Sequence, residues 1–477
     1  MRALSATAKF AYGCGQLAWA AKDTCFQFFL FFYYTQLLGL APSLAGLAAL
    51  LALVFDGISD PIVGQISDNF LSRKWGRRHP FMIAAVVPFC FSLVAVFNPP
   101  ADLSQLQLFA WYLSMAVIAR TSLTFYTVPY MALGAELSQD YSERTSIAVF
   151  RTITAYGGGL SLQMSAWFLL IPMAVASGQI VDGYRSIGFI AAGLSFVGML
   201  IAILATKSYI PHLAKASPVQ QQRAWYLAFI DLWNLLHVRS ARILIGGTLI
   251  GAIAGGVGST LILHINNFFY GFSSVQIGMT MICVFISLIP AAWLSMAGAR
   301  RFGKPKTIVY LSVATAVIGP LPAILHFYGI TPPSGTNALV LAISGFVILH
   351  QTFVISHLNL IGSMLPDVAD EVQLKSGMRQ EGILNSAMMF TSKVTFGIGA
   401  FIAGLTVEFV GFDRVTSIAD VTPEMLSRLA LYVGPGLSVI VLISAYIFSH
   451  YDIDAKRHGE IRDALNTRVL DLEQALE

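Results

Sequence analysis

Charged residues are scarce in this sequence: they make up 11% of its 477 residues, whereas hydrophobic residues make up 56%. So few charges cannot cover the surface of two or three soluble domains, which a chain of this length would otherwise suggest. The mean hydropathy of +0.70 indicates a polytopic membrane protein. Most of the net charge of +4 lies in loops, so we attribute it to the orientation of the chain in the membrane. We therefore expect no nucleic-acid partner.

Cysteine is also rare, and its distribution excludes two classes of protein. The four cysteines are scattered through apolar runs, with no CxxC motif and no clustered histidine: Cys14, Cys25, Cys90 and Cys283. We therefore expect neither a disulfide framework nor a zinc site. The first apolar run carries Lys22 and Asp23 and lacks a small-residue cleavage site, which argues against a signal peptide. No catalytic constellation occurs, so we expect no enzyme and no cofactor.

Twelve apolar runs are long enough to cross a bilayer as helices. They cover residues 9–38, 44–67, 80–98, 106–134, 147–173, 185–206, 241–269, 275–297, 307–328, 336–363, 382–409 and 429–449. With the N-terminus inside, the outside loops hold only Arg185, Arg414 and Arg428 of the 29 lysines and arginines. This asymmetry predicts a multi-pass protein of the plasma (inner) membrane with both termini cytoplasmic.

The chain divides into two similar halves. A basic segment with an aromatic residue and a glycine follows the second run at 72–77 and the eighth at 299–304. We predict an all-α protein of two parallel six-helix bundles, the architecture of major facilitators, with a substrate site near the membrane midplane. The expected domains are 1–206, a cytoplasmic linker at 207–240, 241–450, and a cytoplasmic tail at 451–477.

Two carboxylates interrupt the second apolar run. Asp56 and Asp60 are four residues apart, so on a helix they share a face. Unpaired carboxylates in hydrocarbon cost several kcal/mol, so both must face the protein interior and hold something positive. The candidates are a sodium ion, a proton or a basic side chain.

Six motifs occur in an order that identifies a family. They are residues 56–64, 76–80, 128–137, 143–144, Arg151 and 376–382. Together they resemble the glycoside-pentoside-hexuronide:cation symporters of the major facilitator superfamily. The resemblance implies cation-coupled uptake of a sugar, glycoside or sugar acid by alternating access.

The resemblance also implies a cation site and a coupling residue. It assigns the cation to Asp56, Ser59, Asp60 and Thr124, and it places Lys393 between the cation and the substrate. Carboxylate and hydroxyl oxygens suit sodium, whereas a proton needs only one carboxylate, so we expect sodium rather than a proton. The alternative is a permanent structural network of both aspartates with Lys393 and Arg120.

The resemblance also implies a substrate site, which departs from the family pattern at some of its positions. The resemblance assigns Lys22, Asp23, Tyr130 and Arg151 to the substrate, although Asp23 and Arg151 could instead pair with each other. Carboxylate and guanidinium suit sugar hydroxyls because one accepts hydrogen bonds and the other donates them. The departures lie elsewhere, where the family's sugar-binding aspartate and two tryptophans give way to Thr127, Met131 and Leu358.

Arg120 takes the place of a small residue in the family pattern. It shares one helix face with Thr127, and the two changes make the expected cavity more positive. We therefore predict that Arg120 and Thr127 contact the substrate and favour an anionic one, such as a uronide. The alternative is that Asp60 binds Arg120.

Two charged clusters resemble the cytoplasmic gate of facilitators, which pairs in one state and releases in another. The first comprises Asp68, Arg77 and Arg78. The second lies before the eleventh run and comprises Asp367, Asp370, Arg379 and Glu381. For the second cluster, a solvated amphipathic loop helix is an equal alternative.

Two other functions remain open. The chain also resembles sodium-dependent lysolipid carriers, and the loss of both tryptophans is compatible with a lipid substrate. It could instead be a receptor or structural protein that kept the fold. The expected partners are a small-molecule substrate and membrane lipid, and we expect a monomer.

Overall fold

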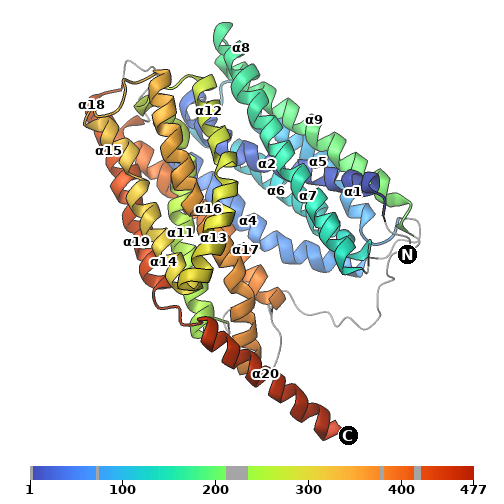
Figure 1. The fold of residues 1–477 in the computed structure, drawn as a ribbon. Coiled ribbons are helices and arrows are strands. Elements are labelled where there is room, and N and C mark those ends of the chain that lie inside the picture. Colours follow the sequence, from blue (N-terminus) through green and yellow to red (C-terminus); the bar gives the residue numbers. More distant parts are fainter. Residues whose placement is uncertain are drawn as a thin grey trace. The chain divides into compact units, whose positions relative to one another are not determined.

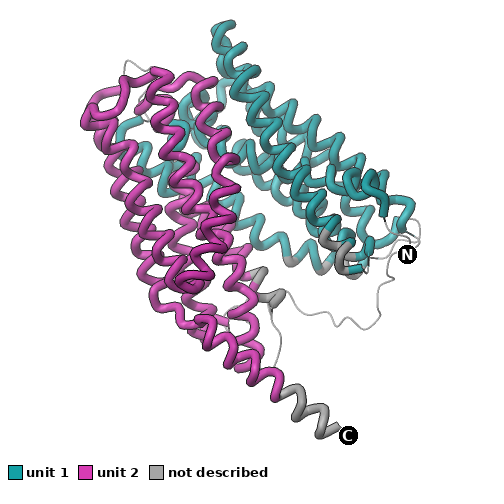
Figure 2. The backbone as a smooth tube through the Cα atoms, viewed as in Figure 1, with its two compact units in different colours: residues 1–225, 262–264, 400–420 teal, residues 226–261, 265–399, 421–477 magenta. Residues whose placement is uncertain are grey.

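The structure is a computed structural model that describes residues 4–70, 75–138, 140–210, 235–376, 381–412 and 421–476. These parts of the chain form helices and contain no strand (Figure 1). They group into two compact units (Figure 2). Unit 1 comprises residues 1–225, 262–264 and 400–420, and unit 2 comprises 226–261, 265–399 and 421–477.

The first predicted span is a helical run that changes its winding. It comprises α1 (Ala6–Gly13), η1 (Cys14–Gln16), α2 (Leu17–Thr24), η2 (Cys25–Phe29), α3 (Leu30–Phe32) and η3 (Tyr33–Leu37). One 3₁₀ turn and one π-helical turn separate the α-helical pieces, and a second π-helical turn ends the run. Because π turns inside helices often mark functional sites, the turn that follows Lys22 and Asp23 draws attention to α2.

The other helices of unit 1 are longer. They are α4 (Pro42–Asn69), α5 (His79–Phe97), α6 (Gln105–Glu136), α7 (Tyr141–Ser165), η4 (Ala166–Leu170), α8 (Ile171–Ala176) and α9 (Ile180–Lys207). Local signals explain several helix starts: α4 has a proline in its first turn, and Ser104 forms a capping box with Gln107 at the start of α6. The α4 helix packs along α6, which brings two polar stretches of sequence together.

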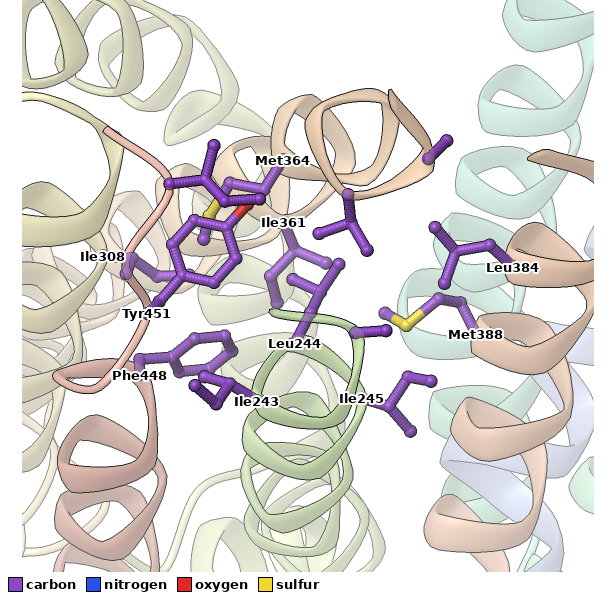
Figure 3. Close-up of a cluster of buried hydrophobic side chains, with 14 of the residues drawn as sticks. Ile243, Leu244, Ile245, Ile308, Ile361, Met364, Leu384, Met388, Phe448 and Tyr451 are labelled. Carbon is purple, nitrogen blue, oxygen red and sulfur yellow. The ribbon is translucent and has the colours of Figure 1, made fainter. Parts of the chain in front are cut away.

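The remaining helices lie in unit 2, except for residues 262–264 of α11 and 400–410 of α17, which belong to unit 1. They are α11 (Arg239–His264), η6 (Ile265–Phe269), α12 (Ser274–Ile286), α13 (Leu288–Phe302), α14 (Lys304–Ile318), α15 (Leu321–Phe327), α16 (Asn337–Ser376), α17 (Glu381–Val410), α18 (Pro423–Leu431), η9 (Tyr432–Gly436), α19 (Leu437–Phe448) and α20 (Ala455–Leu476). Leu244, Ile308, Met364 and Phe448 belong to a buried cluster that joins α11, α14, α16 and α19 (Figure 3). The tail helix α20 adds Ile461 to this cluster, so the tail packs on unit 2.

The predicted spans agree with the structure. Eleven of the described helices are long and apolar enough to cross a membrane, and they coincide with the second to twelfth predicted runs. The first predicted run corresponds to the interrupted helix Ala6–Leu37. The largest difference is at α16, which continues to Ser376 although the apolar run ends at 363. Ion pairs explain the extension, because they satisfy the charged side chains of the last turns.

Candidate functional site

The predicted cation residues come together within unit 1. The Thr124 hydroxyl lies 3.1 Å from Asp56 Oδ1 and 3.0 Å from Asp60 Oδ1. Asp56 and Thr124 are buried, and Asp60 is partly buried. The α4 helix supplies both carboxylates one turn apart, and α6 supplies the hydroxyl opposite them. The structure therefore brings together three of the four residues predicted to bind a cation through their oxygen atoms.

The remaining predicted ligand and the coupling lysine are placed differently. The Ser59 hydroxyl donates to the backbone carbonyl of Asp56 at 3.0 Å, so its proton is used within α4. Its oxygen lone pairs stay available to a cation. Lys393 lies on α17 in unit 2, so its role as the coupling residue stays a prediction.

Arg120 forms a buried ion pair in this site. Its Nη1 lies 3.4 Å from Asp56 Oδ2, and both side chains are 8% exposed. The guanidinium carbon also lies over the Phe26 ring, 4.8 Å from its centre, a favourable cation–π contact. The pair involves Asp56, whereas we expected Asp60 as the alternative partner. Arg120 therefore lies in the carboxylate cluster, and its contact with substrate stays a prediction.

The predicted substrate residues on α2 form a separate polar cluster. Lys22 Nζ lies 3.5 Å from Asp23 Oδ1, and the Gln27 amide donates to Asp23 Oδ2 at 2.6 Å. The Asp23 side chain keeps 30% of its surface exposed, whereas Lys22 keeps 9%. Asp23 can therefore accept hydrogen bonds from a ligand while the lysine neutralises its charge.

Sequence reasoning missed Trp19 and Gln27, which share this face. Trp19, Asp23 and Gln27 follow one another at four-residue intervals, and the Trp19 ring is 41% exposed with Lys22 Nζ 6.0 Å from its centre. Tryptophan on a lipid-facing surface concentrates at the membrane interfaces, but Trp19 lies near the middle of its helix beside two charges. The four-residue spacing from Asp23 was the signal that could have identified both residues.

Three other predicted substrate residues have partners inside unit 1. Tyr130 is 0% exposed and stacks on Tyr12, with each hydroxyl donating to the other residue's backbone carbonyl. The ring is thus buried in this structure, and the contact of Tyr130 with substrate stays a prediction. Arg151 interacts with the Tyr12 hydroxyl. The Thr127 hydroxyl donates to the backbone carbonyl of Leu123 at 2.9 Å, so its proton is used within α6.

The first predicted gate cluster centres on a residue that we did not predict, Glu136. Its Oε1 lies 2.6 Å from Arg77 Nη2 and 3.1 Å from Arg78 Nη2. Arg78 also donates to the Ser67 hydroxyl at 3.1 Å, which links the ends of α4 and α6. The side chain of Asp68 lies outside the described residues. Glu136 could have been identified from the sequence, because it is the one carboxylate in the motif at 128–137.

The second predicted gate cluster is a set of ion pairs within unit 2. Asp367 binds Lys304 at 2.6 Å, and His458 lies 3.1 Å from Asp370 and 3.7 Å from Asp367. Asp367 is buried, so the cluster is not a solvated loop helix. Arg379 and the side chain of Glu381 lie outside the described residues. The gating role of both clusters stays a prediction.

Glu371 connects this cluster to the tail helix. Its side chain is 3% exposed and receives hydrogen bonds or ion pairs from Ser240, Lys375 and Arg457.

We expect Arg457→Ala to lower the free energy of unfolding by about 1 kcal/mol, because Glu371 loses one charged partner and keeps two others. Melting of the purified protein measures the change. The matched control is Arg462→Ala, an exposed arginine of the same helix; equal stability of both variants would contradict the role of Arg457.

Relatives of similar length carry symporter names. An uncharacterized symporter of Synechocystis sp. is 27% identical, with 97% of each chain covered. The putative glycoside/cation symporter YagG of Escherichia coli is 24% identical, with 95% of each chain covered. The sodium-dependent lysophosphatidylcholine symporter 1 of Gallus gallus is also 24% identical, over 97% of this chain and 89% of the relative.

The fold has solved counterparts among transporters. The nucleoside transporter NupG superposes with a TM-score of 0.61 at 16% identity, covering 92% of this chain and 98% of its own. This likeness supports the major facilitator fold. The family model described as "MFS/sugar transport protein" matches residues 11–455, which is nearly the whole chain. The chain therefore belongs to the MFS/sugar transport protein family, whose symporter members include relatives named for glycosides and for lysophosphatidylcholine.

Proposed function

We propose that this protein is a cation-coupled symporter of a sugar or glycoside that works by alternating access. The observation that carries the proposal is the convergence of Asp56, Asp60 and Thr124 in the interior of a transporter-type bundle. Ionisable groups at this depth in a membrane protein are functional by default. A cation bound there and a substrate bound at α2 would favour each other by the same factor, because coupling between two sites is reciprocal.

The face of α2 supports a carbohydrate as the substrate. Asp23 and Gln27 offer carboxylate and amide groups that match sugar hydroxyls, and Trp19 offers an exposed flat ring. A pyranose presents C–H groups to the negative face of an indole, which attracts them. The ion pair with Asp56 neutralises the positive charge of Arg120, which would otherwise favour a uronide. A neutral sugar or glycoside therefore fits better than a sugar acid.

Trp19→Ala tests this substrate surface. We expect the KM for sugar uptake to rise about 2- to 10-fold, because an aromatic contact contributes roughly 0.5–1.5 kcal/mol. Trp19→Phe keeps a flat ring and should retain most of the affinity. Uptake kinetics in proteoliposomes measure both variants. If Trp19→Ala leaves KM unchanged, the ring does not contact the substrate.

Lysolipid transport is the second candidate, because one relative of this chain is named for lysophosphatidylcholine. A thermal-shift screen of the purified protein distinguishes the two. We expect stabilisation by members of a panel of monosaccharides and glycosides, and none by lysophosphatidylcholine below its micelle concentration. The opposite pattern would favour the lipid.

Ligand binding without uptake into proteoliposomes would favour a receptor that kept the fold.

A further inference from the structure

Two helices of unit 2 meet in a sharp turn that gathers basic residues at one end. The α13 and α14 helices pack together and are joined by Gly303 alone (Figure 1). Gly303 has a φ of 77°, a left-handed conformation that favours glycine. The turn therefore brings together four basic residues from the two helix ends: Arg300, Arg301, Lys304 and Lys306.

One of these four charges is neutralised within unit 2. Lys304 Nζ lies 2.6 Å from Asp367 Oδ2 and also donates to the backbone carbonyl of Ser363 at 2.8 Å. The other three side chains are exposed, and none of them forms an ion pair with a carboxylate of the residues that the structure describes: Arg300, Arg301 and Lys306. The turn thus presents three positive charges that an anionic ligand could neutralise.

An exposed apolar face of α13 leads to this basic end. It comprises Ile289, Trp293 and Met296, and the Trp293 ring is 64% exposed. These residues follow one another at intervals of four and three, so they share one side of the helix. Arg300 comes four residues after Met296 and continues the same side. Exposed apolar patches of this kind mark sites of interaction with membrane or protein.

The α14 helix repeats this arrangement in the opposite direction. Its exposed apolar face begins at Lys306 and continues with Tyr310, Val313 and Val317. The intervals are again four, three and four residues, so these side chains also share one side of the helix. Each helix therefore has an exposed apolar face that ends in a basic residue at the turn.

Aromatic rings connect the two helices beside the basic residues. The Phe302 ring of α13 meets the Tyr310 ring of α14 edge to face, with 5.6 Å between their centres. The Arg301 guanidinium carbon lies 5.4 Å from the centre of the Phe302 ring. Tyrosine concentrates at the level of the lipid headgroups in membrane proteins. Guanidinium and phenol groups donate hydrogen bonds that suit phosphate oxygens, so the turn combines positive charge with hydrogen-bond donors.

We propose that α13 and α14 bind an anionic phospholipid, with its headgroup at Arg300, Arg301 and Lys306 and its acyl chains along the two apolar faces. Basic residues in a loop are enough to orient a chain in the membrane. Their alignment with two exposed apolar faces is the feature that indicates a lipid site. A lipid with net negative charge matches the surplus positive charge, whereas a zwitterionic lipid brings its own cation to the turn.

Brominated lipids test the site, because bromine on an acyl chain quenches tryptophan fluorescence on contact. Trp293 lies seven residues before Arg300, about 10 Å along the helix, which places it beside the acyl chains. The purified full-length protein in detergent is titrated with brominated phosphatidylglycerol or brominated phosphatidylcholine. The difference between the wild-type protein and Trp293→Phe reports the quenching of this ring alone.

We expect half-maximal quenching of Trp293 at a roughly 10-fold or lower concentration of phosphatidylglycerol than of phosphatidylcholine. One basic residue near an anionic lipid surface contributes about 5-fold in affinity, so three residues account for such a preference. Equal concentrations for the two lipids would overturn the proposal, as would quenching that Trp293→Phe leaves unchanged.

A triple variant tests the headgroup contacts. Arg300→Gln, Arg301→Gln and Lys306→Gln together should abolish the preference for phosphatidylglycerol. The matched control also replaces two arginines and one lysine by glutamine, at exposed positions elsewhere in unit 2, and should keep the preference: Arg239, Lys456 and Arg462. If the first variant keeps the preference, or if both variants lose it, the lipid does not bind at this turn.

Salt provides a test that needs no charge substitution. Raising the ionic strength from about 0.05 M to about 0.5 M screens exposed charges. We expect the affinity for phosphatidylglycerol to fall several-fold and that for phosphatidylcholine to stay the same. This titration decides the matter even if the triple variant fails to fold, because an affinity for phosphatidylglycerol that does not respond to salt would overturn the proposal. None of these measurements involves sugar or a cation gradient, so their outcome is independent of the proposed function.

Discussion

Asp60→Asn is expected to abolish uphill accumulation of sugar while leaving exchange of sugar across the membrane. Asparagine preserves the size of the side chain and its contact with Thr124, which is 3.0 Å in the wild-type protein, but it lacks the negative charge that binds a cation. The substrate face at α2 is untouched, so downhill exchange persists, although the affinity for substrate falls because no bound cation favours it. Accumulation against a gradient requires the cation, so it should fall to the level of empty liposomes.

The control for this variant is Asp182→Asn. It is the same substitution at an exposed carboxylate of unit 1, where Asp182 pairs with Arg185 and is 53% exposed. We expect normal accumulation. If Asp60→Asn also concentrates sugar normally, the cation site has been assigned to the wrong residues.

Glu136→Gln is expected to cause the largest loss of stability. The Glu136 carboxylate binds Arg77 and Arg78, and the Arg78 side chain is 6% exposed. Removing one partner of a buried ion pair commonly costs about 3–5 kcal/mol, because the remaining charge stays buried without compensation. Two arginines lose their carboxylate here, so the melting temperature should fall clearly and exchange should slow with it.

Glu424→Gln is the matched control for stability. Glu424 pairs with Arg428 one turn away on α18 and is 72% exposed, so its loss should cost less than about 1 kcal/mol. Similar melting temperatures for the two variants would show that Glu136 is not the centre of a buried network. The comparison uses one substitution at a poorly exposed and a well exposed carboxylate, so it measures what burial and the second arginine add together.

The helices were predictable because each requires a long apolar run in a membrane. The predicted run at 80–98 is a clear case, because α5 occupies His79–Phe97. The charged end of α16 was not predictable in this way. Its last turns stay helical because their carboxylates form ion pairs: Asp367 with Lys304 and His458, and Glu371 with Arg457. These partners lie far away in the sequence.

The cation cluster was predictable in part. The four-residue spacing of Asp56 and Asp60 placed both on one face of α4, and the family resemblance supplied Thr124 on α6. The partner of Arg120 was not predictable, because Asp56 and Asp60 differ by one turn and only tertiary packing selects between them. The burial of Tyr130 against Tyr12 likewise depends on how α1 meets α6.

The most direct test of the central claim is sugar accumulation in proteoliposomes that contain the purified protein and are given an inward proton or sodium gradient. The sugar is the strongest stabiliser from the thermal-shift panel. We predict an internal sugar concentration several-fold above the external one under one of the two gradients, which collapses when an ionophore that dissipates that gradient is added. An internal concentration that only equals the external one under every cation gradient would contradict cation-coupled symport.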